Sequence, residues 1–196
     1  MHGRILDAAA ELFTKNGYAG TSIEAIAARA GIGKLTLYRR FADKDAVFLA
    51  VALRMAERSR AELREIADGD GELADVLGAI GRHLLGIILS PQSIAFHRIL
   101  FAEAARLPEL FARIVPDQPT EMPDATRRLF HRLAERGLVR REDVAFLDQQ
   151  FVHAIIGKPL RKALFGASPM TAREQEEHVR KAVALFMHGM TRYSAL

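Results

Sequence analysis

Apolar residues recur along the chain at the three- and four-residue spacing of a helix, and no strand pattern of convincing length occurs anywhere. The first helix is expected over residues 3–16, because its apolar residues share one face. It ends before Gly17, a residue type that adopts the left-handed conformation at low cost. Two shorter helices follow, one closed by Gly31 and one over about 34–40. The pattern predicts an all-α protein.

Short cap motifs mark where the second and third helices begin. Thr21-Ser22-Ile23-Glu24 has the sequence of a capping box, in which the Thr21 hydroxyl and the Glu24 carboxylate satisfy free backbone amides of a new helix. Gly33 stands at the N-cap position of the third helix, and Ile32 and Leu37 have the spacing of a hydrophobic staple. Two helices joined by a glycine-containing turn of about four residues are typical of a helix-turn-helix, whose second helix enters the major groove of DNA.

The third helix has one face that is expected to meet DNA. Because successive residues are about 100° apart, burial of Leu37 turns Leu35 and Arg39 outward. Arg39 can contact guanine edges or phosphate, whereas Leu35 suits thymine methyl groups or is simply an exposed leucine. Lys34 and Tyr38 are expected to hold phosphate groups. The candidate DNA-binding residues are Thr21, Gly33, Lys34, Leu35, Thr36, Tyr38, Arg39 and Lys44.

A basic excess coincides with this face. The segment from Arg29 to Lys44 holds five cationic side chains and one acid, so its net charge of +4 equals the formal charge of the whole chain. Neutralising phosphates releases condensed counterions, so this concentration of charge favours docking on a duplex. A solvated basic face is the alternative. Lys44 lies in the first turn of a fourth helix, where a cation opposes the helix dipole unless a phosphate is near. The alternative is a flexible lysine that points to solvent.

The rest of the chain is predicted to form a second helical module. The fourth helix has Asp43 as its N-cap and continues to about Ala67, so the domain boundary lies inside a helix. We expect a DNA-binding domain over residues 1–50 and an effector-binding and dimerisation domain over 51–196. Further helices are expected at 72–89, 91–105 with a short extension through 108–115, 123–136, 142–165 and 171–192, with Pro116, Pro119 and Pro123 in one extended loop.

The last two helices have more apolar surface than one face of a compact monomer usually requires. A pair of such helices that meets the same pair of a second copy forms a four-helix interface with two-fold symmetry. The alternative is that both stripes belong to the core of one chain. The candidate dimerisation residues are Phe151, Ile155, Leu160, Leu164, Val179, Val183, Phe186, Met187 and Met190.

The run from Thr21 to Phe41, followed by Asp43-Lys44, resembles the DNA-binding domain of the TetR family of transcriptional regulators. Gly33 replaces the serine cap that is common in the family, and Leu35 replaces a small residue or proline. The segment from His97 to Leu110 resembles the C-terminal half of AcrR-like members. The resemblance implies a homodimer that binds a double-stranded DNA operator and responds to a small-molecule effector.

The same resemblance implies a largely apolar cavity among the middle helices. An effector bound there would change the separation of the two DNA-binding heads. Aromatic residues at helical spacing are more often core, and a lone histidine is usually a hydrogen-bonded core residue. The candidate wall residues are Phe96, Phe101, Phe111, Met122, Phe130, Phe151 and Ile155, with His83, His97, Arg98 and His153 as candidate polar anchors.

Composition excludes several other classes of protein. The chain has no cysteine, so disulfides, thiolate metal sites and cysteine nucleophiles are excluded. It has no nucleophile-elbow motif, no phosphate-binding glycine loop and no metal-spaced histidine pair, so we expect neither an enzyme nor a cofactor. Its apolar tracts are too short to span a bilayer, which predicts a cytoplasmic protein without membrane contact.

These features together predict a ligand-responsive, homodimeric transcriptional regulator, and we expect a repressor. Two alternatives stay open: a DNA-binding regulator without small-molecule control, and a helical protein-interaction adaptor whose basic face binds acidic partners. The adaptor accounts for the helices and the charge but not for the two capped helices on either side of the turn. The operator, the regulated genes and the effector are not encoded in any recognisable motif.

Overall fold

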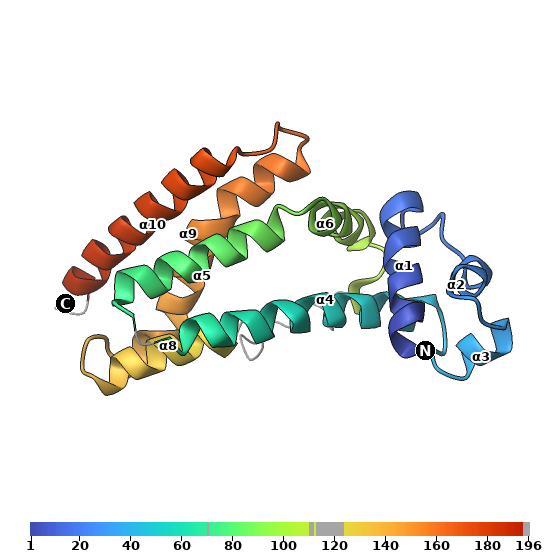
Figure 1. The fold of residues 1–196 in the computed structure, drawn as a ribbon, viewed down its shortest axis with the longest axis horizontal. Coiled ribbons are helices and arrows are strands. Elements are labelled where there is room, and N and C mark those ends of the chain that lie inside the picture. The colour runs from blue at the N-terminus through green and yellow to red at the C-terminus, as the bar shows by residue number, and fades with distance from the viewer. Residues whose placement is uncertain (70, 110–111, 113–123, 194–196) are drawn as a thin grey trace. The chain divides into compact units, whose positions relative to one another are not determined.

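The computed structural model describes residues 1–69, 71–109, 112 and 124–193, apart from the side chains of residues 58–60, 124, 125 and 190–193. In this described part the chain is helical and contains no strand, which confirms the all-α prediction (Figure 1). The elements are α1 His2–Asn16, α2 Ile23–Ala30, α3 Lys34–Tyr38, α4 Lys44–Ala67, α5 Leu73–Ile88, α6 Pro91–Glu103, α8 Asp124–Glu135, the 3-10 helix η2 Arg141–Asp143, α9 Val144–Leu164 and α10 Ala172–Tyr193.

The helices belong to two compact units. The first unit contains Met1–Glu57 and Ala95–Asp117, and the second contains Arg58–Ile94 and Gln118–Leu196. The unbroken helix α4 contributes residues to both. The predicted domain boundary between residues 50 and 51 therefore lies inside α4, and it stays a prediction.

An aromatic cluster forms the centre of the first unit. Phe13 of α1 meets Phe48 of α4 edge to face, with ring centroids 5.1 Å apart. Phe48 also stacks on Phe96 of α6 at 4.8 Å. Around these rings, α2 buries Ile26 and α3 buries Leu37 completely. The two short helices are thus anchored by their apolar faces on a packed base, which compensates for the low intrinsic stability of helices this short.

In the second unit, α5 packs against both α9 and α10, and α8 packs against α9. The approach is closest at Gly81 of α5. A Cβ at that position would lie 2.9 Å from Cγ1 of Val179 on α10 and 3.0 Å from Cδ1 of Ile155 on α9. A larger residue here would force the Val179 and Ile155 side chains to shift, so glycine allows the three helices to pack this closely.

Polar contacts fix the C-terminal end of α4 within the same unit. Arg132 of α8 donates a hydrogen bond to the carbonyl oxygen of Ala67, one of the last-turn carbonyls that lack a partner inside the helix. The same guanidinium lies 3.4 Å from a carboxylate oxygen of Asp68. Arg132 therefore caps one helix from the surface of another.

Some helix ends differ from the predicted ones. The third helix ends at Tyr38 instead of Arg40, and the sixth ends at Glu103 instead of residue 105. A 3-10 turn precedes α9, which begins at Val144. Most of the predicted extension 108–115 and the loop with Pro116, Pro119 and Pro123 lie outside the described residues.

The length and hydropathy of the described helices can be compared with those of a membrane-spanning helix. No single one of them combines the length and the apolar composition of a membrane span, although α5 and α6 pass the same test when they are taken as a pair.

The packing of α5 predicts opposite effects for one substitution at two glycines. Gly81→Ala should lower the free energy of unfolding by about 1–3 kcal/mol, because its methyl group overfills the contact with Val179. Gly86→Ala, on the same helix with nothing within 4 Å, should raise it by up to about 1 kcal/mol. Urea unfolding of the two variants at equal protein concentration measures both. A gain in stability for Gly81→Ala would contradict the packing.

Candidate DNA-binding interface

The turn between α1 and α2 corrects the predicted capping box. The N-cap of α2 is Ser22, whose hydroxyl accepts a hydrogen bond from the Ala25 amide at 3.1 Å. Thr21 is almost fully buried, and its hydroxyl oxygen lies 2.7 Å from the carbonyl oxygen of Gly17 and 3.2 Å from that of Leu12. Because a hydroxyl has one proton, the shorter contact is the hydrogen bond that it donates. Thr21 closes the turn and presents no surface for DNA.

Backbone geometry explains the sharp turn between α2 and α3. Gly31 ends α2 in the left-handed conformation, with φ 65° and ψ 41°, which favours glycine. Gly33 is the N-cap of α3 as predicted, but its backbone is extended and no side chain caps the helix. Its carbonyl oxygen accepts the amide of Thr36 at 2.9 Å. Gly33 thus sets the start of α3 through its backbone alone.

The outer face of α3 matches the predicted orientation. Leu37 is fully buried, whereas Leu35 is 68% exposed and Tyr38 is 42% exposed. Arg39 is exposed and Thr36 is half-buried. The backbone amides of Arg40 and Phe41 both donate to the Leu37 carbonyl oxygen. The chain therefore forms a hydrogen-bonded turn directly after the helix. The face therefore presents an apolar, an aromatic and a cationic side chain to solvent.

Acids outside the segment neutralise part of its charge. Arg29 pairs with Glu11 of α1 at 2.6 Å. Lys34 pairs with Glu24 of α2, and this hydrogen bond raises the pKa of Lys34 and lowers that of Glu24. Within the described residues, neither Arg39 nor Arg40 forms an ion pair. The free positive charge is thus concentrated at the C-terminal end of α3, where Arg40 joins the predicted candidates.

Lys44 is engaged inside its own unit instead of pointing freely to solvent. Its ammonium group donates to the carbonyl oxygen of Tyr18 at 2.9 Å and lies 4.2 Å from the centre of that ring. The Tyr18 hydroxyl bonds to Asp45, and burial is the main reason why the pKa of Tyr18 is raised, with this bond second. Asp43 caps α4 as predicted, because its carboxylate accepts the Ala46 amide at 2.7 Å. This cluster holds the start of α4 against the end of α1.

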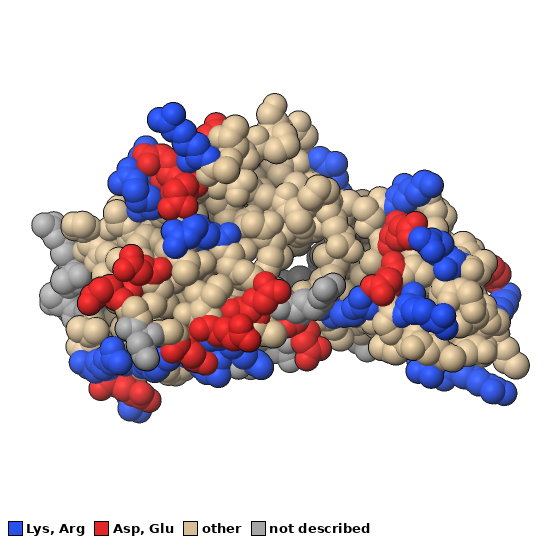
Figure 2. All heavy atoms as spheres, viewed as in Figure 1, with Lys and Arg blue, Asp and Glu red and all other residues tan. Residues whose placement is uncertain are grey.

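Figure 2 shows basic side chains, with acidic ones between them, on the part of the first unit that carries α2 and α3.

The first unit is matched over residues 5–51 by the family model of bacterial regulatory proteins of the tetR family. The model of the AefR-like transcriptional repressor C-terminal domain matches residues 75–194, more than half of the chain. The chain belongs to the TetR family of transcriptional regulators. Its C-terminal part matches the AefR-like model, whereas the sequence resemblance was to AcrR-like members.

Individual relatives agree with this membership. The HTH-type transcriptional regulator YvkB of Bacillus subtilis is 26% identical over 192 residues and covers 96% of both chains. UidR of Escherichia coli K12 is 41% identical over 66 residues, 34% of each chain. These relatives are regulators and not enzymes.

Solved structures share the fold. A protein from Mesorhizobium loti that is classed as a TetR-family transcriptional regulator superimposes with a TM-score of 0.85 at 25% identity, covering 96% of this chain and 95% of its own. FadR from Bacillus subtilis, solved in complex with stearoyl-CoA, has a TM-score of 0.74 at 14% identity, covering 96% and 99%. The second likeness concerns the fold alone.

The predicted effector-binding residues of this TetR-family chain do not form one group. Phe130, Phe151 and Ile155 are fully buried in the second unit, whereas Phe96 is buried in the core of the first. Three of the other candidates are exposed, namely Phe101 (65%), Arg98 and His153. His83 and His97 are half-buried, and Nδ1 of His83 lies 3.6 Å from a carboxylate oxygen of Glu62. Phe111 and Met122 lie outside the described residues.

Two cavities in the second unit are lined by residues that the prediction did not include. One, of about 140 Å³, lies beside Leu73, Leu129 and Arg136. The other, of about 400 Å³, lies between α9 and α10. In the described part of the chain, no three histidine or acidic side chains converge as a metal ion would need.

Four side chains of the predicted dimerisation set are buried inside one chain. Phe151, Ile155, Val179 and Val183 form the core of the second unit and offer no surface to another copy. Leu160, Leu164, Phe186 and Met187 are half-buried, and the side chain of Met190 lies outside the description. Phe186 packs edge to face with Phe151 at 5.3 Å. The exposed apolar residues on these helices include Phe146 and Leu185, which the periodicity did not single out.

The buried hydroxyl of Thr21 predicts a change in stability without a direct change in DNA affinity. Thr21→Val should lower the free energy of unfolding by about 1–3 kcal/mol, because the Gly17 carbonyl loses the hydrogen bond that the buried Thr21 hydroxyl donates. The matched change Thr14→Val, at an exposed site on α1, should have little effect. Chemical unfolding measures the difference. Full stability with a large loss of DNA affinity would return Thr21 to the DNA contacts.

Proposed function

We propose that this TetR-family regulator is a homodimeric repressor that binds a two-fold operator through α3. A small molecule with a largely apolar body releases it. A protein with this role works in the cytoplasm, where the operator lies. The proposal is carried by the outer face of α3, on which Leu35 and Tyr38 are exposed. Directly after the helix, Arg39 and Arg40 lack acidic partners in the described residues.

The chemistry of that face suits a duplex better than an acidic protein surface. A free guanidinium can bind guanine edges or phosphate oxygens through two parallel hydrogen bonds. Leu35 is more exposed than Tyr38, and a leucine there can pack on thymine methyl groups. The Tyr38 hydroxyl can donate to a phosphate without reading sequence. The adaptor alternative leaves this combination of side chains unexplained.

A dimer is needed because α3 is short. Its five residues offer little contact area, so two copies on half-sites about 34–36 Å apart, or a multiple of that, provide the affinity. Phe146 on α9 is 48% exposed and Leu185 on α10 is 75% exposed. Burial of such residues against a second copy stabilises a two-fold interface.

Release by an effector requires two arrangements of the protein that bind the ligand unequally. Equal affinity for both would shift no population. The structure of Bacillus subtilis FadR contains stearoyl-CoA, a ligand with a long apolar chain, which supports an apolar effector for a protein of the same fold.

A second candidate function is DNA binding without small-molecule control. It is favoured by the close packing of Phe130, Phe151 and Phe186, whose ring centroids lie 5.3–6.4 Å apart where an effector cavity was expected. The two candidates differ in one observable. If small-molecule extracts of the source cells leave DNA retention unchanged at every concentration, the second is favoured.

The direct test of the proposed function is to isolate the genomic fragments that the purified protein retains. A repressor should retain a short, two-fold symmetric sequence, with affinity that falls steeply as salt increases. Retention of all fragments alike, at every salt concentration, would exclude an operator-binding regulator.

Two substitutions at the C-terminal end of α3 should separate base reading from phosphate binding. Arg39→Ala should cost about 1–3 kcal/mol on the cognate operator and little on unrelated DNA. Tyr38→Phe should weaken both by a similar factor, because it removes a phosphate contact. Arg161→Ala on α9 is the control. Gel retardation on cognate and scrambled DNA measures all three variants, and unchanged specificity in Arg39→Ala would remove that residue from base reading.

A further inference from the structure

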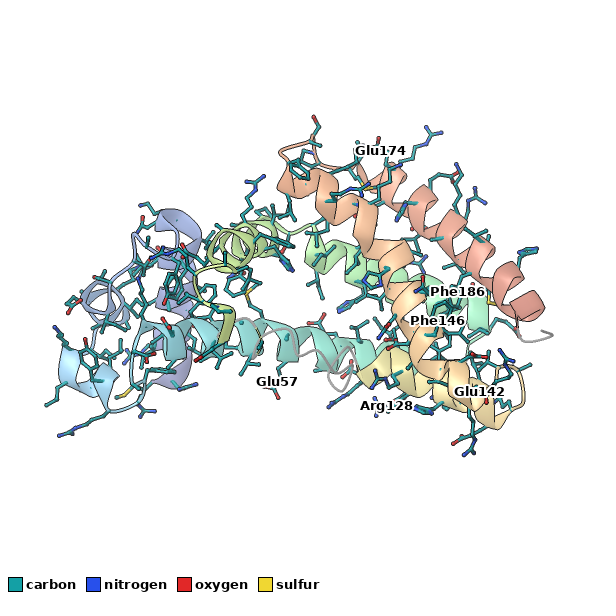
Figure 3. The ribbon with its side chains drawn as sticks, turned by 180° about the vertical axis from the view of Figure 1, so that it is seen from behind. Glu57, Arg128, Glu142, Phe146, Glu174 and Phe186 are labelled. Carbon is teal, nitrogen blue, oxygen red and sulfur yellow. The ribbon has the colours of Figure 1, made fainter. Side chains whose placement is uncertain are left out.

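The cavity of about 400 Å³ in the second unit has a distinct chemistry. It lies where the C-terminal part of α9 meets the N-terminal part of α10, and Glu174 in the first turn of α10 marks this end (Figure 3). Pro159 and Met170 give it an apolar surface. Charged side chains make up most of the remaining wall, and the helix-turn-helix contributes none of it.

A side chain of α10 replaces a missing backbone donor of α9 at this end of the two helices. Pro159 has no N–H, so the carbonyl of Ile155, four residues earlier, loses its partner inside α9. His178 of α10 supplies the replacement, because its Nε2 lies 2.8 Å from that oxygen. A carbonyl oxygen only accepts, so Nε2 of His178 carries a proton and donates this hydrogen bond. His178 also lines the cavity, which is therefore built around a fixed side chain.

The acids of the cavity wall are already engaged. Glu174 accepts the amide and the hydroxyl of Thr171 at 2.7 and 2.8 Å, and chiefly the backbone bond lowers its pKa. Glu177 accepts two hydrogen bonds from Arg180 and pairs with Lys181 at 3.1 Å. The Arg180 guanidinium and the Lys181 ammonium lower the pKa of Glu177 to about 2. Both carboxylates therefore stay charged and partnered.

Three cations of the wall have no such partner. Within the described residues, Lys158, Lys162 and Arg173 form no ion pair, although the charge of Lys162 contributes to lowering the pKa of Glu174. The cavity thus combines an apolar surface with an excess of unpaired positive charge. Ligand sites in proteins commonly have this pattern of mostly apolar walls with a few charged groups that fix orientation.

We propose that this cavity binds a small amphipathic anion, with the apolar body against Pro159 and Met170 and the anionic group at Lys158, Lys162 and Arg173. A carboxylate, a sulfonate and a phosphate share this chemistry. The proposal goes beyond operator binding and effector release. Binding of the anion to this cavity requires neither bound DNA nor the effector that releases the protein from its operator. Its failure would leave the role of α3 untouched.

The test uses the full-length protein and two matched fluorescent probes. The anion 8-anilinonaphthalene-1-sulfonate should bind at one site per chain, and the uncharged N-phenyl-1-naphthylamine should bind more weakly. In the double variant Lys158→Gln, Lys162→Gln, affinity for the anion should fall about tenfold, a difference of about 1.4 kcal/mol. Affinity for the uncharged probe should change less than twofold. Arg161→Gln, an exposed cation of α9 outside the cavity wall, is the control for overall charge.

Several results would overturn the proposal. One is equal weakening by the control Arg161→Gln, which would indicate a general charge effect. Another is no saturable binding of the anion to the wild-type protein. A third is a changed sedimentation coefficient in the double variant with unchanged probe binding, which would assign the cavity to a contact between copies. Arg173→Gln is an independent second variant of the cavity wall, on α10. Its circular dichroism spectrum should match that of the wild-type protein, which shows that the variant is folded.

Discussion

The burial of Leu37 is the constraint on which the DNA-binding unit depends. This side chain is completely covered by the core around Phe13 and Phe48, and its burial contributes about 2 kcal/mol. Because α3 has five residues, one inward side chain fixes the rotation of the whole helix. Rotation of α3 by one residue position would turn Thr36 or Tyr38 inward and leave Leu37 in water. The outward direction of Leu35 and Arg39 is therefore a consequence of hydrophobic packing.

Local chemistry made much of this unit predictable from sequence. Gly31 and Asp43 act through their own backbone or the next turn, so their positions as helix end and N-cap could be inferred directly. Thr21 and Ser22 could not be told apart in this way, because both can cap α2. The Leu12 and Gly17 carbonyls of the preceding helix and turn select Thr21 for burial, and that contact depends on how α1 packs. The same holds for the ion pair between Arg29 and Glu11, which are far apart in sequence.

Periodicity has a comparable limit in the second unit. It identifies the apolar face of α9 and α10, but not whether the same chain or another copy covers it. Val179 and Ile155 are covered by α5, which approaches them closely because Gly81 has no side chain. Phe146 and Leu185 remain exposed on these helices and lie outside the regular apolar spacing. Nothing in the sequence pattern therefore predicted that they would be at the surface. The link from His178 to the Ile155 carbonyl was likewise not predictable, since it joins two helices through a backbone atom.

Operator binding by this protein requires the outer face of α3 to lie against paired bases. Photocrosslinking from a benzoylphenylalanine placed at position 35 tests it directly, because Leu35 is 68% exposed. A second probe at Phe165, which is 87% exposed in the other unit, controls for chance encounters. The account predicts crosslinks to retained operator DNA from position 35 and none from position 165. Equal yields from both positions, or none from position 35, would contradict it.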